Sequence, residues 1–246
     1  MKLPASLLLA ALLAAPVISS VAQQPAAPAA AANAPAPATA AAAANGQAPA
    51  ATPAAAAGPA APVQGPVRPD PALGEQRYTA VCASCHGADG NSAVPANPKL
   101  AQQHPEYLVK QLQEFKSGKR PSPIMQAFAA QLTDADMKNI AWWVASNPAK
   151  PGFAKDKELV SLGERIYRGG IADRQIAARA GCHSPNGAGI PAQYPRLSGQ
   201  HADYTAGELV EFRDGKRPNS VQMTQIAAKL NDREIRAVSD YIAGLR

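Results

Sequence analysis

An internal repeat is the feature that most limits how this chain can fold. The sequence from Leu100 to Pro121 returns from Leu197 to Pro218, with half of the positions identical at an offset of 97. After one inserted residue, the correspondence continues from Met125 to Met223. Self-similarity this dense indicates a duplicated domain. Each copy is then about 80 to 90 residues long, so the chain must adopt a fold that so short a unit can form twice.

Both copies carry the patterns of helices. Leu108, Leu112 and Phe115 fall at i, i+4 and i+7, which places them on one face of a helix. The segments Thr133–Asp136 and Asn231–Glu234 are typical of helix N-terminal caps, and an amphipathic segment follows each of them. Alternating patterns typical of strands are few. The sequence therefore predicts an all-α fold.

Four segments are predicted along the chain. Residues 1–22 combine a basic start, an apolar run and a small-residue cleavage site, which indicates a secretory signal peptide and export to the periplasm. Residues 23–70 are mostly Ala and Pro, with too few large apolar side chains to offset the entropy of ordering, so we expect a disordered spacer. Two small domains are expected at 71–148 and 155–246, joined through a Pro-containing link from Asn147 to Gly152. No segment after the signal peptide is long and apolar enough to span a membrane.

The first copy contains a motif with specific chemistry, Cys82-Ala-Ser-Cys85-His86. In C-x-x-C-H, two thiols can add to the two vinyl groups of a haem while the adjacent histidine binds the iron. The alternatives are a thioredoxin-like redox pair or half of a zinc site. The sequence has no second C-x-x-C and no βαβ pattern around the motif, which argues against both. A haem would also supply apolar surface that so small a domain lacks.

The second copy changes this motif. At the same offset it reads Arg179-Ala-Gly-Cys182-His183, which keeps the histidine but only one thiol, enough for at most one thioether bond. Met125 and Met223 are equivalent in the repeat, and each follows its histidine by about 40 residues, so each is a candidate sixth iron ligand. The alternative for both methionines is ordinary core packing. A thioether opposite a histidine closes the iron and favours electron transfer over oxygen or peroxide chemistry.

From about Ala72 to Leu245 the chain resembles a dihaem class I cytochrome c of the c-four kind, in which a duplication has produced two mitochondrial-cytochrome-like domains. The resemblance implies two haems c, the first with two thioether bonds and the second with at most one. It implies covalent attachment through Cys82, Cys85 and Cys182, and axial iron ligation by His86, Met125, His183 and Met223. That family carries two complete motifs, so Arg179 is a departure from its pattern.

Three further polar pairs recur in both copies: His104 and His201, Tyr107 and Tyr204, and Arg120 and Arg217. The histidines could be alternative iron ligands, but they precede a predicted helix, which is more typical of first-turn or surface residues. The arginines either form charge-assisted hydrogen bonds with haem propionates or lie in a solvated loop. The tyrosines either pack or direct a hydroxyl toward a polar edge of the haem.

These features predict an electron carrier rather than an enzyme, with redox proteins as partners: a respiratory or dehydrogenase donor and an acceptor such as a terminal oxidase. A peroxidase needs an open iron site, which the two methionines argue against. Two alternatives remain: an electron-transfer subunit permanently attached to an oxidoreductase, or a monohaem carrier whose second domain has lost its haem. A formal net charge of only +6, without a basic run interleaved with aromatics, argues against nucleic acid.

Overall fold

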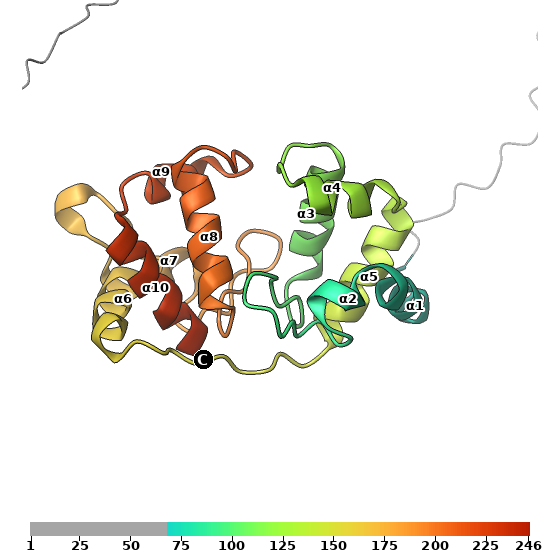
Figure 1. Cartoon of the computed structure of the whole chain (residues 1–246), viewed down its shortest axis with the longest axis horizontal. Helices are drawn as coiled ribbons and strands as arrows, with labels where there is room; N and C mark the ends of the chain where they lie inside the picture. The colour runs from blue at the N-terminus through green and yellow to red at the C-terminus, as the bar shows by residue number, and fades with distance from the viewer. Residues whose placement is uncertain (1–67) are drawn as a thin grey trace, which may run out of the picture. The chain divides into compact units, whose positions relative to one another are not determined.

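The computed structural model describes residues 68–246, drawn in colour in Figure 1. The expected signal peptide, and the expected spacer apart from its last three residues, lie outside the described residues. The described residues belong to one compact unit of helices and loops. They contain isolated bridges but no strand, so the all-α prediction is confirmed. None of their helices is long and apolar enough to cross a membrane.

The helices follow the same order in the two halves of this unit (Figure 1). The first half contains α1 (Pro71–Val81), α2 (Ala83–His86), α3 (Pro105–Lys116), α4 (Pro123–Ala130) and α5 (Asp134–Ser146). The second contains α6 (Lys157–Gly169), the 3-10 turn η1 (Ala172–Arg174), α7 (Ala180–His183), α8 (Ala202–Arg213), α9 (Val221–Ala227) and α10 (Asp232–Gly244). Helix α1 packs on α5 as α6 packs on α10, and α3 contacts α4 and α5 as α8 contacts α9 and α10. The duplication read from the sequence is therefore a duplication of structure.

The helix starts follow from local sequence. The Thr133 hydroxyl accepts a hydrogen bond from the Asp136 N–H at 3.0 Å, and the Asp136 carboxylate accepts one from the Thr133 N–H at 2.9 Å. Asn231 and Glu234 form the same reciprocal pair, with both distances 3.0 Å. These two capping boxes begin α5 and α10 as predicted, and satisfy N–H groups that a helix otherwise leaves unpaired.

Glycines allow the closest helix contact in each half. A Cβ atom added to Gly74 on α1 would lie 2.2 Å from the carbonyl oxygen of Asn139 on α5. One added to Gly163 on α6 would lie 2.1 Å from the carbonyl oxygen of Ala237 on α10. No side chain fits at either distance, so only glycine permits these crossings.

Two fully buried tyrosines, Tyr78 and Tyr167, connect these long helices to the short ones that follow them. The Tyr78 hydroxyl donates to the Gly87 carbonyl at 2.9 Å, and the Tyr167 hydroxyl donates to the Ser184 carbonyl at 2.7 Å. Each acceptor is the residue directly after the motif histidine. The packing of α1 and α6 therefore fixes the end of the haem motif in each half.

Each half has its own apolar core. The predicted stripe on α3 is confirmed, because Leu108 and Phe115 are buried and Leu112 packs partly buried against the first core. The first core contains Tyr78, Leu108, Leu132, Met137, Ile140, Ala141 and Val144. The second contains Ile166, Tyr167, Ile176, Leu209, Phe212, Ala227, Leu230, Ile235, Val238, Ile242 and Leu245.

Candidate functional site

The first haem motif lies where α1 ends and α2 begins. Cys82 caps α2, and its carbonyl accepts the His86 N–H at 3.0 Å, which forms one tight turn around the motif. Cys82 is half-buried, Cys85 is exposed and His86 is buried. Both cysteines are free thiols, and burial raises the pKa of Cys82 to about 11. The turn therefore presents two unpaired thiols and one imidazole together.

Both motif histidines are held in the form that binds a metal. Nδ1 of His86 lies 3.0 Å from the Pro98 carbonyl oxygen, and Nδ1 of His183 lies 2.9 Å from the Pro195 carbonyl oxygen. A carbonyl can only accept, so each Nδ1 carries the proton and each Nε2 keeps a free lone pair. Burial lowers the pKa of His86, and lowers that of His183 to about 4. Both rings are therefore neutral at neutral pH.

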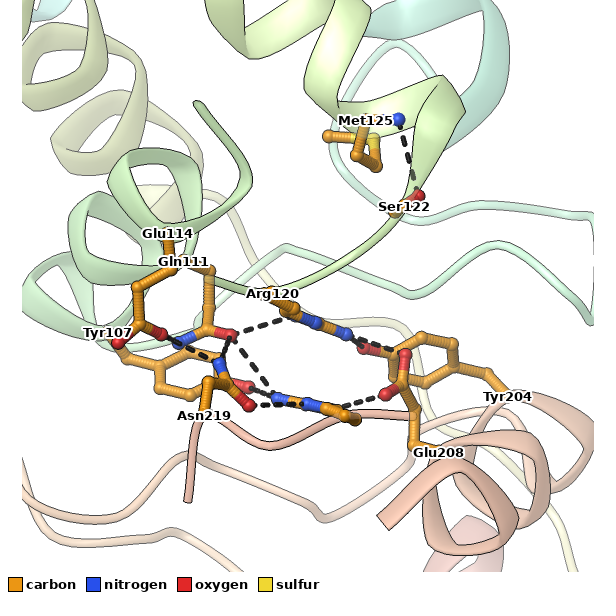
Figure 2. Close-up of polar contacts among 10 residues, drawn as sticks. Tyr107, Gln111, Glu114, Arg120, Ser122, Met125, Tyr204, Glu208 and Asn219 are labelled. Atoms are coloured by element: carbon orange, nitrogen blue, oxygen red, sulfur yellow. Dashed lines mark hydrogen bonds and ion pairs between the residues drawn. The ribbon is translucent and has the colours of Figure 1, made fainter. Parts of the chain in front are cut away.

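The two candidate methionine ligands occupy equivalent positions in the first turns of α4 and α9. The N–H of Met125 donates to the Ser122 hydroxyl at 3.3 Å (Figure 2), and that of Met223 donates to the Ser220 hydroxyl at 3.4 Å. Both methionine side chains are only half-buried, whereas Met137 on α5 is fully enclosed in the first core. Core packing therefore accounts for Met137, whereas Met223 packs only in part against the second core and neither it nor Met125 is enclosed.

In the second motif, Arg179 takes the backbone position that Cys82 takes in the first. Arg179 caps α7, and its carbonyl accepts the N–H of His183 at 2.8 Å. Its side chain is 4% exposed, and none of its three guanidinium nitrogens has a hydrogen-bond partner among the described residues. Burial lowers the pKa of Arg179 to about 10, so the group is still charged at neutral pH. An unpaired buried charge is costly, which is the mark of a site built around a further group.

The donor sets fit haem in both halves. Each half offers a buried neutral imidazole with a free Nε2 and a half-buried thioether on an equivalent helix. The first half adds two thiols at C-x-x-C spacing, and the second adds Cys182, a half-buried free thiol. An imidazole and a thioether are the axial pair typical of electron-transferring c-type haems.

The repeated arginines do not lie in a solvated loop, and that prediction is wrong. Arg120 and Arg217 are each 6% exposed and meet at one carboxylate, Glu208, on α8 (Figure 2). Nη2 of Arg120 donates to Glu208 at 2.6 Å, and Nη1 of Arg217 donates to the other carboxylate oxygen. Burial opposes ionisation of Glu208, but the two arginines outweigh it and lower its pKa. The carboxylate is therefore shared by arginines from both halves.

The repeated tyrosines complete this contact. Nη2 of Arg120 also donates to the Tyr204 hydroxyl at 3.0 Å, and Nη2 of Arg217 donates to the Tyr107 hydroxyl at 3.2 Å. Each arginine thus reaches the tyrosine of the opposite half. We call the whole group the interdomain cluster, which comprises Tyr107, Gln111, Glu114, Arg120, Tyr204, Glu208, Arg217 and Asn219.

The repeated histidines lie at helix starts, as expected, and they also contact the opposite half. Nε2 of His104 lies 3.0 Å from the Ala188 carbonyl oxygen, and Nε2 of His201 lies 2.8 Å from that of Ser92. Both histidines precede a helix as predicted, but as the caps of α3 and α8. Their ring nitrogens are therefore used between the two halves.

Two glutamines extend the contact, and sequence reasoning missed them. Gln103 donates to the Arg196 carbonyl at 2.9 Å and accepts from the Arg196 N–H at 2.8 Å. Gln200 forms the same reciprocal pair with Lys99, with both distances 2.9 Å. The available signal was the repeat itself, because Gln103 and Gln200 are identical polar residues at equivalent positions.

Comparison with known proteins agrees with this architecture. The family model "Cytochrome c" matches residues 71–148 and 179–246. A cytochrome c4 of Thiocapsa roseopersicina is 48% identical over 190 residues, covering 76% of this chain and 96% of the relative. A thiosulfate dehydrogenase electron acceptor of Stutzerimonas stutzeri (strain A1501) is 38% identical over 170 residues, covering 67% of this chain and 78% of the relative. The crystal structure of reduced recombinant cytochrome c4 from Pseudomonas stutzeri aligns with a TM-score of 0.69 at 41% identity, covering 72% of this chain and all of that one.

Two tandem helical domains, each with a histidine fixed for metal binding beside at least one free thiol, define a c-type cytochrome. The chain belongs to the cytochrome c family, in its dihaem cytochrome c4 group. The prediction of an electron-transfer protein rather than an enzyme is confirmed, and haem c is its cofactor.

Proposed function

We propose that this chain is an exported dihaem cytochrome that carries single electrons from a respiratory or dehydrogenase donor to an acceptor such as a terminal oxidase. The observation that carries this proposal is the pair of buried, neutral histidines, each aligned through Nδ1 by a proline carbonyl. A signal peptide at residues 1–22 supports a periplasmic location, with a spacer at 23–70 and domains at 71–148 and 155–246.

In the first domain, Cys82 and Cys85 would hold the haem through two thioether bonds. Nε2 of His86 and the sulfur of Met125 would be the axial ligands. The Pro98 carbonyl orients the imidazole, and the capped start of α4 positions the thioether. The cofactor supplies an iron that exchanges one electron, and the protein contributes ligation and exclusion of water.

In the second domain, Cys182 would form a single thioether bond, with His183 and Met223 as axial ligands. Arg179 stands where a complete motif has its first cysteine. The Pro195 carbonyl and the Tyr167 hydroxyl fix the turn that carries His183, so its ligating nitrogen is oriented without the missing thiol. We therefore expect one covalent bond to be sufficient in this site.

Pyridine haemochrome quantification against protein concentration tests this assignment. We expect two haems per chain, with the α-band of one displaced because only one of its vinyl groups is saturated. One haem per chain would instead support a monohaem carrier, and colourless exported protein would refute the proposal.

A matched pair of cysteine variants tests the attachment. In Cys182→Ser the second haem should become extractable with acidified acetone while the first stays bound to the chain. In Cys85→Ser the first haem keeps one thioether bond, through Cys82, and neither haem should be extractable. Failure of Cys182→Ser to release any haem would exclude a thioether at that residue.

A second candidate function is the electron acceptor of a thiosulfate-oxidising enzyme, either free or attached. The observation that favours it is the 38% identity to the thiosulfate dehydrogenase electron acceptor. Mixing the oxidised chain with a thiosulfate dehydrogenase and thiosulfate would distinguish the two. Rapid reduction and co-purification support the attached role, whereas reduction only by a quinol-oxidising complex supports the respiratory carrier.

A further inference from the structure

The second haem motif contains a buried positive charge at the position where the first motif has Cys82. The arginine that acts on Cys82 in the first site, Arg77, is only half-buried and donates to the Gln131 carbonyl at 3.0 Å. Arg179 occupies the position equivalent to Cys82, and its side chain is 96% buried. Its Nε, Nη1 and Nη2 atoms have no hydrogen-bond partner among the described residues, and no carboxylate is among the described groups that act on its charge. The charge is therefore neither shared with an acid nor exposed to water.

This charge acts on the groups that would hold the haem. Arg179 directly precedes α7, the short helix that carries Cys182 and His183, and its carbonyl accepts the His183 N–H at 2.8 Å. The guanidinium also interacts electrostatically with the Tyr167 hydroxyl, which is neutral and donates to the Ser184 carbonyl. Since a buried charge is weakly screened, its effect on neighbouring groups is much larger than in water.

We propose that the Arg179 guanidinium raises the reduction potential of the second haem iron; the inference rests on the proposed binding of that haem by His183 and Met223. The oxidised iron carries one more positive charge than the reduced iron, so a nearby cation destabilises the oxidised form. One electron enters from a redox-protein donor, no bond forms or breaks, and no proton moves because the guanidinium stays protonated in both states. At this position the second site therefore lacks one covalent attachment and has instead a positive charge that favours the reduced state.

Spectroelectrochemical titration of the full, haem-loaded chain tests this inference. The second haem is followed at the displaced α-band expected for a single thioether bond. Arg179→Gln removes the charge without restoring a thiol, and we expect the equilibrium constant for reduction of the second haem to fall at least tenfold, which is 59 mV for one electron. The potential of the first haem should not change.

Two controls separate charge from shape. Arg179→Lys keeps a cation and should retain most of the wild-type potential. Arg174→Gln removes an arginine of the same domain that is partly exposed and paired with Glu234, so it should leave both potentials unchanged. An unmoved second potential in an Arg179→Gln protein that still carries two haems would overturn the inference.

The number of haems per chain distinguishes failure of this inference from failure of the proposed function. One haem per wild-type chain would remove the second site, and the inference with it. If Arg179→Gln does not load its second haem, Arg179→Cys restores the complete motif; its second haem is then identified as the one whose potential differs from that of the first haem in the wild type, and it must show the same tenfold loss. An Arg179→Cys protein with an unchanged second potential would overturn the role of the charge.

Discussion

At the scale of single residues, the two sites share one hydrogen bond that orients the motif histidine. In both, a proline carbonyl accepts a hydrogen bond from the Nδ1–H of a buried imidazole, which leaves the other ring nitrogen free to bind a metal. Sequence reasoning identified His86 and His183 from their motifs, but not Pro98 and Pro195, because a backbone carbonyl leaves no signature in residue type. The orientation of each ring is therefore information that only the structure contains.

The proposed methionine ligands give a prediction at this scale. Met125→Ala and Met223→Ala should each remove half of the weak near-infrared absorption of thioether-to-iron coordination in the ferric protein. Each variant should also bind carbon monoxide in the ferrous state, because the sixth iron position opens. Near-infrared spectra and carbon monoxide titration are the measurements.

Met137→Leu is the matched control for these variants. It changes a fully buried methionine in the first core, so it should keep the whole near-infrared band and bind no carbon monoxide. A full band in Met125→Ala or Met223→Ala would exclude that methionine as a ligand.

At the scale of helices, short sequence signals determined most of the fold. The capping boxes at Thr133 and Asn231 and the apolar stripe on α3 were predicted and are present. The close crossings at Gly74 and Gly163 were not predicted, although the pairing of these glycines in the repeat was visible. A glycine can serve a turn, a cap or a close contact, and the sequence does not say which.

Gly163→Ala should destabilise the second domain, because the new methyl group would lie 2.1 Å from the Ala237 carbonyl oxygen. We expect a loss of about 1–3 kcal/mol in the free energy of unfolding, as for overpacked cores. Urea unfolding followed by circular dichroism measures it.

Gly207→Ala is the control, since Gly207 lies within α8 and an added Cβ meets no atom within 4 Å. Alanine is the better helix former, so this variant should gain about 0.5–1 kcal/mol. Equal stability of the two variants would show that the α6–α10 crossing is not tightly packed.

At the scale of the whole molecule, the polar residues that recur in both copies join the two halves. The sequence revealed which residues recur but not why. For Arg120 and Arg217 the sequence leaves haem contact and solvent exposure as alternatives. The structure instead places both arginines with Glu208 between the domains. Contacts between residues about 100 positions apart follow from tertiary packing, which local pattern does not encode.

Glu208→Gln should weaken the joining of the halves, because it leaves two buried arginines without their carboxylate. We expect a loss of about 3 kcal/mol in the free energy of unfolding at neutral pH. Glu211→Gln, on the exposed side of the same helix, should change it by less than about 0.5 kcal/mol. Urea titration of both variants is decisive, and an unchanged Glu208→Gln protein would contradict the role of the interdomain cluster.

The same carboxylate predicts a dependence on pH. The folded state lowers the pKa of Glu208 below its ordinary value of 4.5, so the folded state binds this proton more weakly than the unfolded chain. The stabilisation is therefore complete above pH 4.5 and is lost as the pH falls through and below that value. Wild type should lose more stability than Glu208→Gln between pH 6 and pH 3, and parallel curves would refute this.

The reciprocal glutamine pairs have a consequence for the origin of the molecule. Gln103 binds the backbone of Arg196 as Gln200 binds that of Lys99, so each half offers the other the same patch of surface. Such self-complementary contact is the pattern of a twofold homodimer. A single ancestral domain with this patch would already contain both surfaces of the interface. Gene fusion would then have made a transient pair permanent. The two halves would have diverged afterwards, for example at Arg179.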